Sequence, residues 1–134
     1  MRIVLDTNVL ISGVFFGGLP GRILEAWRDG QIHLVLSPEI LDEYQRVGDQ
    51  IGEQHQGVDL GPFLRLLAVN AEIVDAPGLT EGISRDPDDD KFLACAIAAG
   101  VGVIVSGDKD LIASSGWRDV RVLRPRQFVD QLLG

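Results

Sequence analysis

Four acidic residues spread along the chain are the best candidates for chemistry: Asp6, Glu43, Asp90 and Asp108. Asp6 directly follows an apolar run (IVL), and Asp108 closely follows another (VIV), as acids at the ends of buried strands would. Carboxylate oxygens without nearby His or Cys ligands suit Mg²⁺ or Mn²⁺ better than zinc. The residue types therefore predict a site for one or two of these ions, provided that the fold brings three or four of the acids together.

The stretch DPDDDKFLACA contains four aspartates within five residues, at 86 and at 88–90. A calcium loop of the EF-hand type is excluded, because Lys91 stands where that loop needs glycine and Ile97 where it needs glutamate. A helix start explains most of the cluster. Asp86 is the expected N-cap, Pro87 suits the first helical position, and acids in the first turn meet the positive end of the helix dipole.

Asp90 is not explained by the helix start. It stands on one helical face with Leu93, Ala94 and Ile97, and a carboxylate on an apolar face is costly unless a cation compensates its desolvation. Because this helix is apolar on nearly all sides, a small shift of register would give Asp89 the same role.

The segment SPEILDEY raises the same question about Glu43. Ser37 and Pro38 are typical of a helix start. Glu43 then shares a largely apolar face with Ile40 and Val47. An ion pair with Arg46 or a solvated position is the alternative to a role as metal ligand.

Alternating strands and helices must position these acids. We predict strands over 2–5, 32–36, 72–74, 101–105 and 120–123, and helices over 20–29, 38–47, 63–70, 87–100, 109–113 and 125–133, with a mobile loop or weak helix over 48–61. This order favours a three-layer α/β/α sandwich around a central, mostly parallel sheet, in a single domain spanning 1–134. Ligands of such sheets bind beyond the carboxyl ends of the strands, where Asp6, Ser106 and Asp108 are expected.

Composition narrows the class of protein. The chain has 134 residues and a net charge of −8, which argues against binding of nucleic acid by net electrostatic attraction. No apolar run is long enough to cross a bilayer, and a lone cysteine, Cys95, in an apolar helix indicates core packing and a cytoplasmic protein. Four arginines near the carboxyl end form either a solvated face or an RNA-backbone contact: Arg118, Arg121, Arg124 and Arg126.

The sequence resembles the PIN-domain nucleases. The resemblance rests on VLDTNVLIS, SPEILDEY, DPDDDKFLACAIAAG and VSGDKDLI, which follow one another in the order and spacing of the family pattern over essentially the whole chain. It is closest to the small bacterial PIN proteins that act as toxins in toxin–antitoxin modules.

The resemblance implies a Mg²⁺- or Mn²⁺-dependent endoribonuclease that cuts single-stranded RNA. The acidic quartet of the family carries over to Asp6, Glu43, Asp90 and Asp108, and its supporting polar positions to Asn8, Ser106 and Asp110. It further implies a homodimer or higher homo-oligomer, and a cognate antitoxin that blocks the active site.

Other classes fit the sequence less well. A phosphatase of the D-x-D type would need a second aspartate where Asn8 stands, and a receiver domain would need a lysine at the end of a late strand. Gly100 and Gly102 precede a strand instead of opening a helix, unlike a dinucleotide-binding fingerprint. The remaining alternative is a PIN fold without catalytic activity that binds a protein or RNA.

Overall fold

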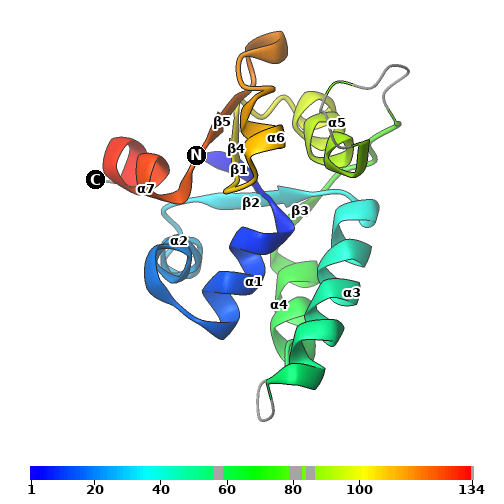
Figure 1. Ribbon diagram of the computed structural model, residues 1–134, viewed down its shortest axis with the longest axis vertical. Helices are drawn as coiled ribbons and strands as arrows, with labels where there is room; N and C mark the ends of the chain where they lie inside the picture. The colour runs from blue at the N-terminus through cyan, green and yellow to red at the C-terminus, as the bar shows by residue number, and fades with distance from the viewer. Residues whose placement is uncertain (56–58, 79–82, 84–86, 134) are drawn as a thin grey trace.

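The computed structural model describes residues 1–55, 59–78, 83 and 87–133 (Figure 1). At its centre is a five-stranded sheet in the order β3-β2-β1-β4-β5, and every neighbouring pair is parallel. Its strands are β1 (Arg2–Leu5), β2 (His33–Leu36), β3 (Glu72–Ile73), β4 (Val103–Val105) and β5 (Arg121–Leu123). The predicted α/β fold with a parallel central sheet is confirmed.

Helices cover both faces of this sheet. They are α1 (Thr7–Phe15), α2 (Gly18–Arg28), α3 (Pro38–Gln54), α4 (Gly61–Asn70), α5 (Asp90–Ala99), α6 (Lys109–Ile112) and α7 (Pro125–Phe128). A 3₁₀ turn over Pro87–Asp89 leads into α5, another covers Trp117–Asp119, and a π-helical turn over Val129–Leu133 follows α7.

The direction of the connections decides which helix covers which face. From β1 the chain steps through β2 to β3, and it then returns to the other side of β1 for β4 and β5. Right-handed crossovers therefore place α1 to α4 on one face and α5 and α6 on the other, below and above the sheet in Figure 1. The α5 helix packs across β1, β2 and β4.

The central strands are buried on both sides, as expected for a parallel sheet covered by two layers of helices. In β1, Ile3, Val4 and Leu5 are at most 1% exposed. Tyr44 of α3 is equally buried and donates its hydroxyl to the Leu5 carbonyl at 2.6 Å. The carboxyl end of β1 is thus fixed by side-chain hydrogen bonding as well as by its strand neighbours.

Two predicted segments differ from the structure. No helix was predicted directly after Asp6, but α1 occupies Thr7–Phe15, and its apolar sequence has no clear amphipathic period. The α3 helix continues to Gln54 instead of ending near Val47. Gly48 lies inside it because Leu60 packs there: a Cβ at this position would stand 2.0 Å from the Leu60 Cδ2 atom. The glycine that suggested a loop therefore allows close packing of the next segment against α3.

Among the described residues, no single helix has the length and apolar character to cross a bilayer; α1 and α2 pass that test only as a pair, and they meet at a 92° bend.

Candidate metal centre

The acidic region begins where β1 and β4 end side by side. The register pairs Leu5 with Val105, so the next residues along each strand, Asp6 and Ser106, are neighbours at the carboxyl edge. The Asp6 amide donates to the Val105 carbonyl at 2.9 Å. The strand order reverses between β1 and β4, and this switch point is where open α/β sheets bind their ligands.

Asp6 is the most constrained of the predicted acids. Its side chain is 5% exposed, and the buried Ser106 hydroxyl donates to its Oδ2 atom at 2.6 Å. Burial raises the pKa of Asp6, and the charges of Asp108 and Glu43 raise it further, while hydrogen bonds from Ser106 and the Thr7 backbone oppose the rise. Asp108 and Glu43 are therefore both close enough to act electrostatically on Asp6.

Asp108 reaches this edge through the loop that follows β4. Its backbone amide donates to the Ser106 Oγ atom at 2.9 Å, so one hydroxyl links the two acidic residues. Asp108 is also the N-cap of α6, since its Oδ1 atom accepts from the Asp110 amide at 2.8 Å. Ser106 and Asp110 thus both contact the site region, each through a short hydrogen bond.

Glu43 approaches from α3 on a side chain that is 14% exposed. Its Oε1 atom accepts from the Lys91 ammonium at 2.6 Å, and its Oε2 atom accepts from the Thr7 hydroxyl. Arg46, the ion-pair partner considered from the sequence, lies farther away at 3.7 Å and is 64% exposed. Lys91 is therefore the main cation beside Glu43.

Thr7 and Lys91 were missed as site residues, and Asn8 is less well placed than expected. Thr7 is 3% exposed and contacts Glu43, whereas its neighbour Asn8 is exposed. Thr7 could have been found from the sequence, because it carries a hydroxyl and directly follows Asp6. Nothing in the sequence joined Lys91 to Glu43, because the two residues are 48 positions apart.

The start of α5 places its acids differently from one another. Asp89 is buried, with 7% of its side chain exposed, whereas Asp90 is only partly buried. The Asp90 Oδ2 atom accepts from the Ile83 amide at 3.3 Å, and Asp90 lines a hollow of about 440 Å³ together with Ser37 and Lys91. Asp89 is thus the more buried of the two acids that the sequence left open, while Asp90 shares its hollow with Lys91, the partner of Glu43. The predicted N-cap, Asp86, lies outside the described residues.

The structure divides the four arginines between two ends of one strand. Arg124 directly follows β5 at the carboxyl edge, where the Ser106 amide donates to the Leu123 carbonyl, and Arg126 follows in α7. Arg121 begins β5, and Arg118 precedes it, with its guanidinium 4.8 Å from the Trp117 ring centroid. Only Arg124 and Arg126 are thus on the side of the strand where the acids lie.

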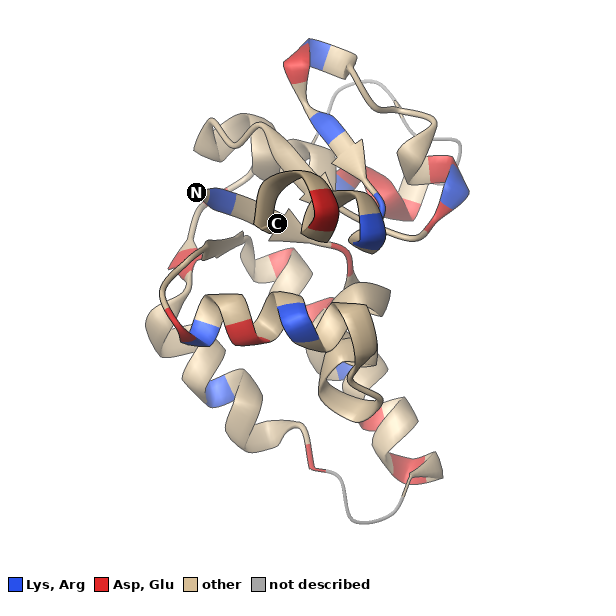
Figure 2. Cartoon of the chain, turned by 90° about the vertical axis from the view of Figure 1, so that its left-hand side faces the viewer, with Lys and Arg blue, Asp and Glu red and all other residues tan. Residues whose placement is uncertain are grey.

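Away from the acidic edge, the described helices carry charges of both signs. Figure 2 shows basic and acidic residues interspersed along the helices.

The single cysteine, Cys95, is fully buried, and this burial raises the pKa of its thiol to about 12. Cys95 is therefore a core residue, as predicted, and remains a neutral thiol at physiological pH.

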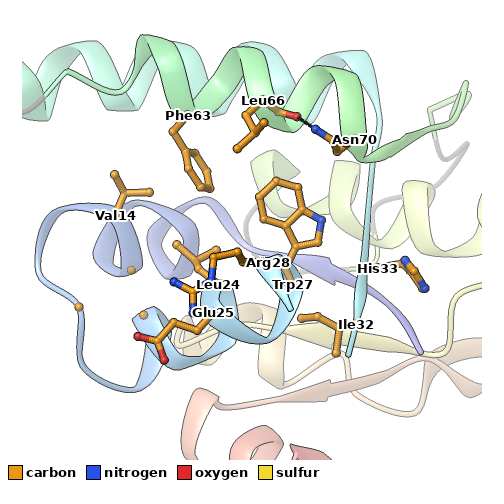
Figure 3. Close-up of a pocket in the computed structure, with 13 residues that line it drawn as sticks. Val14, Leu24, Glu25, Trp27, Arg28, Ile32, His33, Phe63, Leu66 and Asn70 are labelled. Carbon is orange, nitrogen blue, oxygen red and sulfur yellow. Dashed lines mark hydrogen bonds between the residues drawn. The ribbon is translucent and has the colours of Figure 1, made fainter. Parts of the chain in front are cut away.

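Another hollow among the described residues contains none of the predicted acids. It measures about 710 Å³ and lies between the α1–α2 hairpin and α4, with Trp27 and Phe63 meeting edge to face at 5.8 Å (Figure 3). Leu24, Leu66 and Ile32 add to its mostly apolar wall. Its lining residues are separate from those of the acidic edge of the sheet.

The donor chemistry of the acidic edge fits a hard divalent cation, since it consists of carboxylates and hydroxyls. The side-chain arrangement is not that of a finished metal site. Among the residues that the structure describes, no three His, Cys, Asp or Glu side chains are grouped closely enough to hold an ion. Both oxygens of Glu43 contact other side chains, Lys91 and Thr7.

Comparisons with known proteins agree with the fold. Residues 2–110 match the model of a PIN domain family. The chain belongs to the PIN domain family. Its fold is also similar to a chain in the crystal structure of VapBC2 from Rickettsia felis bound to a DNA fragment from their promoter, with a TM-score of 0.63 and 16% identity over 92% of this chain and 98% of that one. No curated protein matches the sequence significantly.

Proposed function

We propose that this PIN domain is a metal-dependent endoribonuclease that hydrolyses phosphodiester bonds of single-stranded RNA. The observation that carries the proposal is Asp6, a carboxylate 5% exposed at the switch point of the sheet, with Asp108 and Glu43 near enough to raise its pKa. Like charges gathered in a buried place are unfavourable without a cation. A bound Mg²⁺ or Mn²⁺ ion would relieve that repulsion.

The acids would hold one or two such ions, with Asp6 as the central ligand and Glu43 and Asp108 beside it. For the acid at the start of α5 we propose Asp90, the residue suggested by the family pattern, which shares a hollow with Lys91, with the more buried Asp89 as the alternative. When bound, the metal supplies an activated water and stabilises the departing oxyanion.

The remaining residues have positioning roles in this proposal. Ser106 donates to Asp6 and accepts from the Asp108 amide, so it fixes the relative position of the two strand-end acids. Thr7 holds the Glu43 side chain toward the same edge. We propose that Arg124, which follows β5 at the carboxyl edge, contacts the RNA backbone, since a guanidinium offers several donors to phosphate oxygens.

A toxin role within a toxin–antitoxin pair is the biological setting that we propose. The support is the family pattern together with the similar fold of a chain in VapBC2, which was crystallised on a DNA fragment from its promoter. A toxin that is held by a DNA-binding antitoxin would occur in such a complex. We further propose a cytoplasmic homodimer in which residues 1–134 act as one nuclease domain; light scattering on the purified chain measures its oligomeric state.

A PIN fold without catalytic activity, which binds RNA or a protein, is the second candidate. The engagement of both Glu43 oxygens and the absence of a ready three-ligand group among the described residues favour it. Whether Glu43 can be released from Lys91 and Thr7 distinguishes the two functions, because a carboxylate that is already paired must be released before it can bind metal.

The direct test is cleavage of end-labelled single-stranded RNA and DNA of the same sequence, with Mn²⁺, Mg²⁺ or EDTA. The proposed nuclease cuts the RNA with either metal and leaves it intact in EDTA. Binding of RNA without cleavage in any of the three conditions would support the binding module instead. Cleavage that persists in EDTA would contradict metal dependence.

A further inference from the structure

Lys91 is unusual among the basic residues because its charge is directed into the acidic region. It is one of two lysines in the chain, lies in the first turn of α5, and has a side chain only 22% exposed. Its ammonium donates to the Glu43 Oε1 atom at 2.6 Å, which is a short charge-assisted hydrogen bond. The other lysine, Lys109, is exposed on α6.

The position of this ammonium is where a cation bound to Glu43 would be expected. Glu43 is 14% exposed, so its charge is poorly screened by water and requires compensation. Thr7 satisfies one of its oxygens, and Lys91 neutralises the other. The more exposed Arg46 stands 3.7 Å away and contributes less.

We propose that Lys91 is a built-in counter-ion that competes with the metal for Glu43 and thereby sets the metal concentration at which the site fills. This inference rests on the proposed function, since it presumes a divalent cation at the acids. A lysine suits the role because its charge is compact and its four-carbon stem is flexible, so the ammonium can leave Glu43 without a backbone movement. Lys91 is thus a positioning residue that acts through Glu43.

Competition has a definite consequence for metal binding. Each time a metal binds Glu43, the Glu43–Lys91 pair must first break, so the cost of breaking it weakens the observed affinity. Removal of the ammonium abolishes that cost and leaves the acidic region more negative. Both effects tighten metal binding, whereas a purely structural ion pair would change the stability of the protein and leave its metal affinity unchanged.

The test measures Mn²⁺ affinity by isothermal titration calorimetry for the wild type, Lys91→Met, Lys91→Arg and Arg46→Met. Lys91→Met is expected to lower the Kd for Mn²⁺ by about two- to fivefold, as for loss of one ion pair. Lys91→Arg retains the charge and should restore most of the wild-type Kd. Arg46→Met removes the same charge from the same carboxylate at a longer distance and is expected to change the Kd by less than about twofold.

The outcomes separate this inference from the proposed function. If the wild type binds Mn²⁺ and Lys91→Met binds it equally or more weakly, the competition is refuted and the metal site stands. If neither protein binds Mn²⁺, both the metal site and the competition are refuted. Binding that appears only in Lys91→Met would support the competition in its strongest form.

A second measurement uses the unmodified wild type and does not depend on how the variants fold. The chain has two lysines, so mass spectrometry after brief treatment with an amine-reactive acetylating reagent reports on each. Release of Lys91 from Glu43 by Mn²⁺ should increase its modification severalfold relative to Lys109. An unchanged ratio at saturating Mn²⁺ would show that the pair survives metal binding and would overturn the inference.

Discussion

The two halves of the acidic region are held in different ways. In the strand half, Asp6 and Asp108 are fixed by backbone hydrogen bonds and by the shared Ser106 hydroxyl. In the helix half, Glu43 is held by other side chains, namely Lys91 and Thr7. The strand half is therefore pre-organised, while the helix half can rearrange when a cation arrives. Substitutions in the two halves should differ in size and in kind.

The largest effect is expected in the strand half. Asp6→Asn removes the central carboxylate and should reduce RNA cleavage at saturating Mn²⁺ by at least about a hundredfold, the upper range for loss of a supporting residue at a metal site. Asp42→Asn is the matched control, because Asp42 is an exposed aspartate beside Glu43. Wild-type cleavage by the Asp6 variant would remove this residue from the site.

Comparison of Asp89→Asn with Asp90→Asn tests which acid at the start of α5 is the ligand in the helix half. Asp90 shares a hollow with Lys91, the partner of Glu43, so its replacement is expected to lower cleavage about tenfold or more beyond the effect at Asp89. Steady-state rates on the same labelled RNA measure the difference. The reverse order would identify the more buried Asp89 as the ligand instead.

Ser106→Ala tests the link within the strand half. The hydroxyl contacts Asp6 at 2.6 Å and the Asp108 amide at 2.9 Å, so its loss should weaken Mn²⁺ binding about tenfold and lower the free energy of unfolding by about 1–2 kcal/mol. Ser115→Ala is the control, since the Ser115 hydroxyl accepts from the Val122 amide at 2.9 Å away from the acids. Equal Mn²⁺ affinities for both variants would argue against pre-organisation by Ser106.

The pH dependence of stability tests the burial of Asp6 in the strand half. Burial raises the pKa of Asp6 above its ordinary value of 3.8, so ionised Asp6 destabilises the folded state. Its contribution to stability is complete below that ordinary value and is lost as the pH rises through the higher folded pKa. In EDTA, Asp6→Asn should therefore melt a few degrees above the wild type at pH 7, and the difference should disappear in acid. A variant that melts below the wild type at pH 7 would contradict this sign.

The smallest effect is expected from the arginines. Arg124→Ala should weaken RNA binding a few-fold and reduce the slope of log K against log salt by about 0.7, as for one lost phosphate contact with a single strand. Arg118→Ala, at the other end of β5, should leave both quantities unchanged. Equal losses would indicate a single basic patch across the two ends of the strand.

The sequence predicted the strand half better than the helix half, for a physical reason. Short β-branched runs ending in acids determine both the strands and the edge to which Asp6 and Asp108 belong. The Ser106 contact follows from the register of β1 and β4, and such register is a regular property of parallel sheets.

Features that depend on side chains from distant elements could not be predicted in this way. The Lys91 contact with Glu43 requires the packing of α5 near α3, and the burial of Asp89 over Asp90 depends on a 3₁₀ turn before α5. The length of α3 was underestimated because Gly48 is a loop signal in isolation and a packing position against Leu60 in the fold. Local pattern determines elements, while tertiary contacts determine which side chains meet.

The most direct test of the account is the position of Mn²⁺ in a crystal of the wild-type protein, located by its anomalous scattering. If Asp6 is the central ligand, a strong peak is expected about 2.1 Å from one of its carboxylate oxygens and close to Asp108, with Ser106 still hydrogen-bonded to Asp6. A peak at other acids, or none beside Asp6 at a Mn²⁺ concentration that supports RNA cleavage, would contradict it.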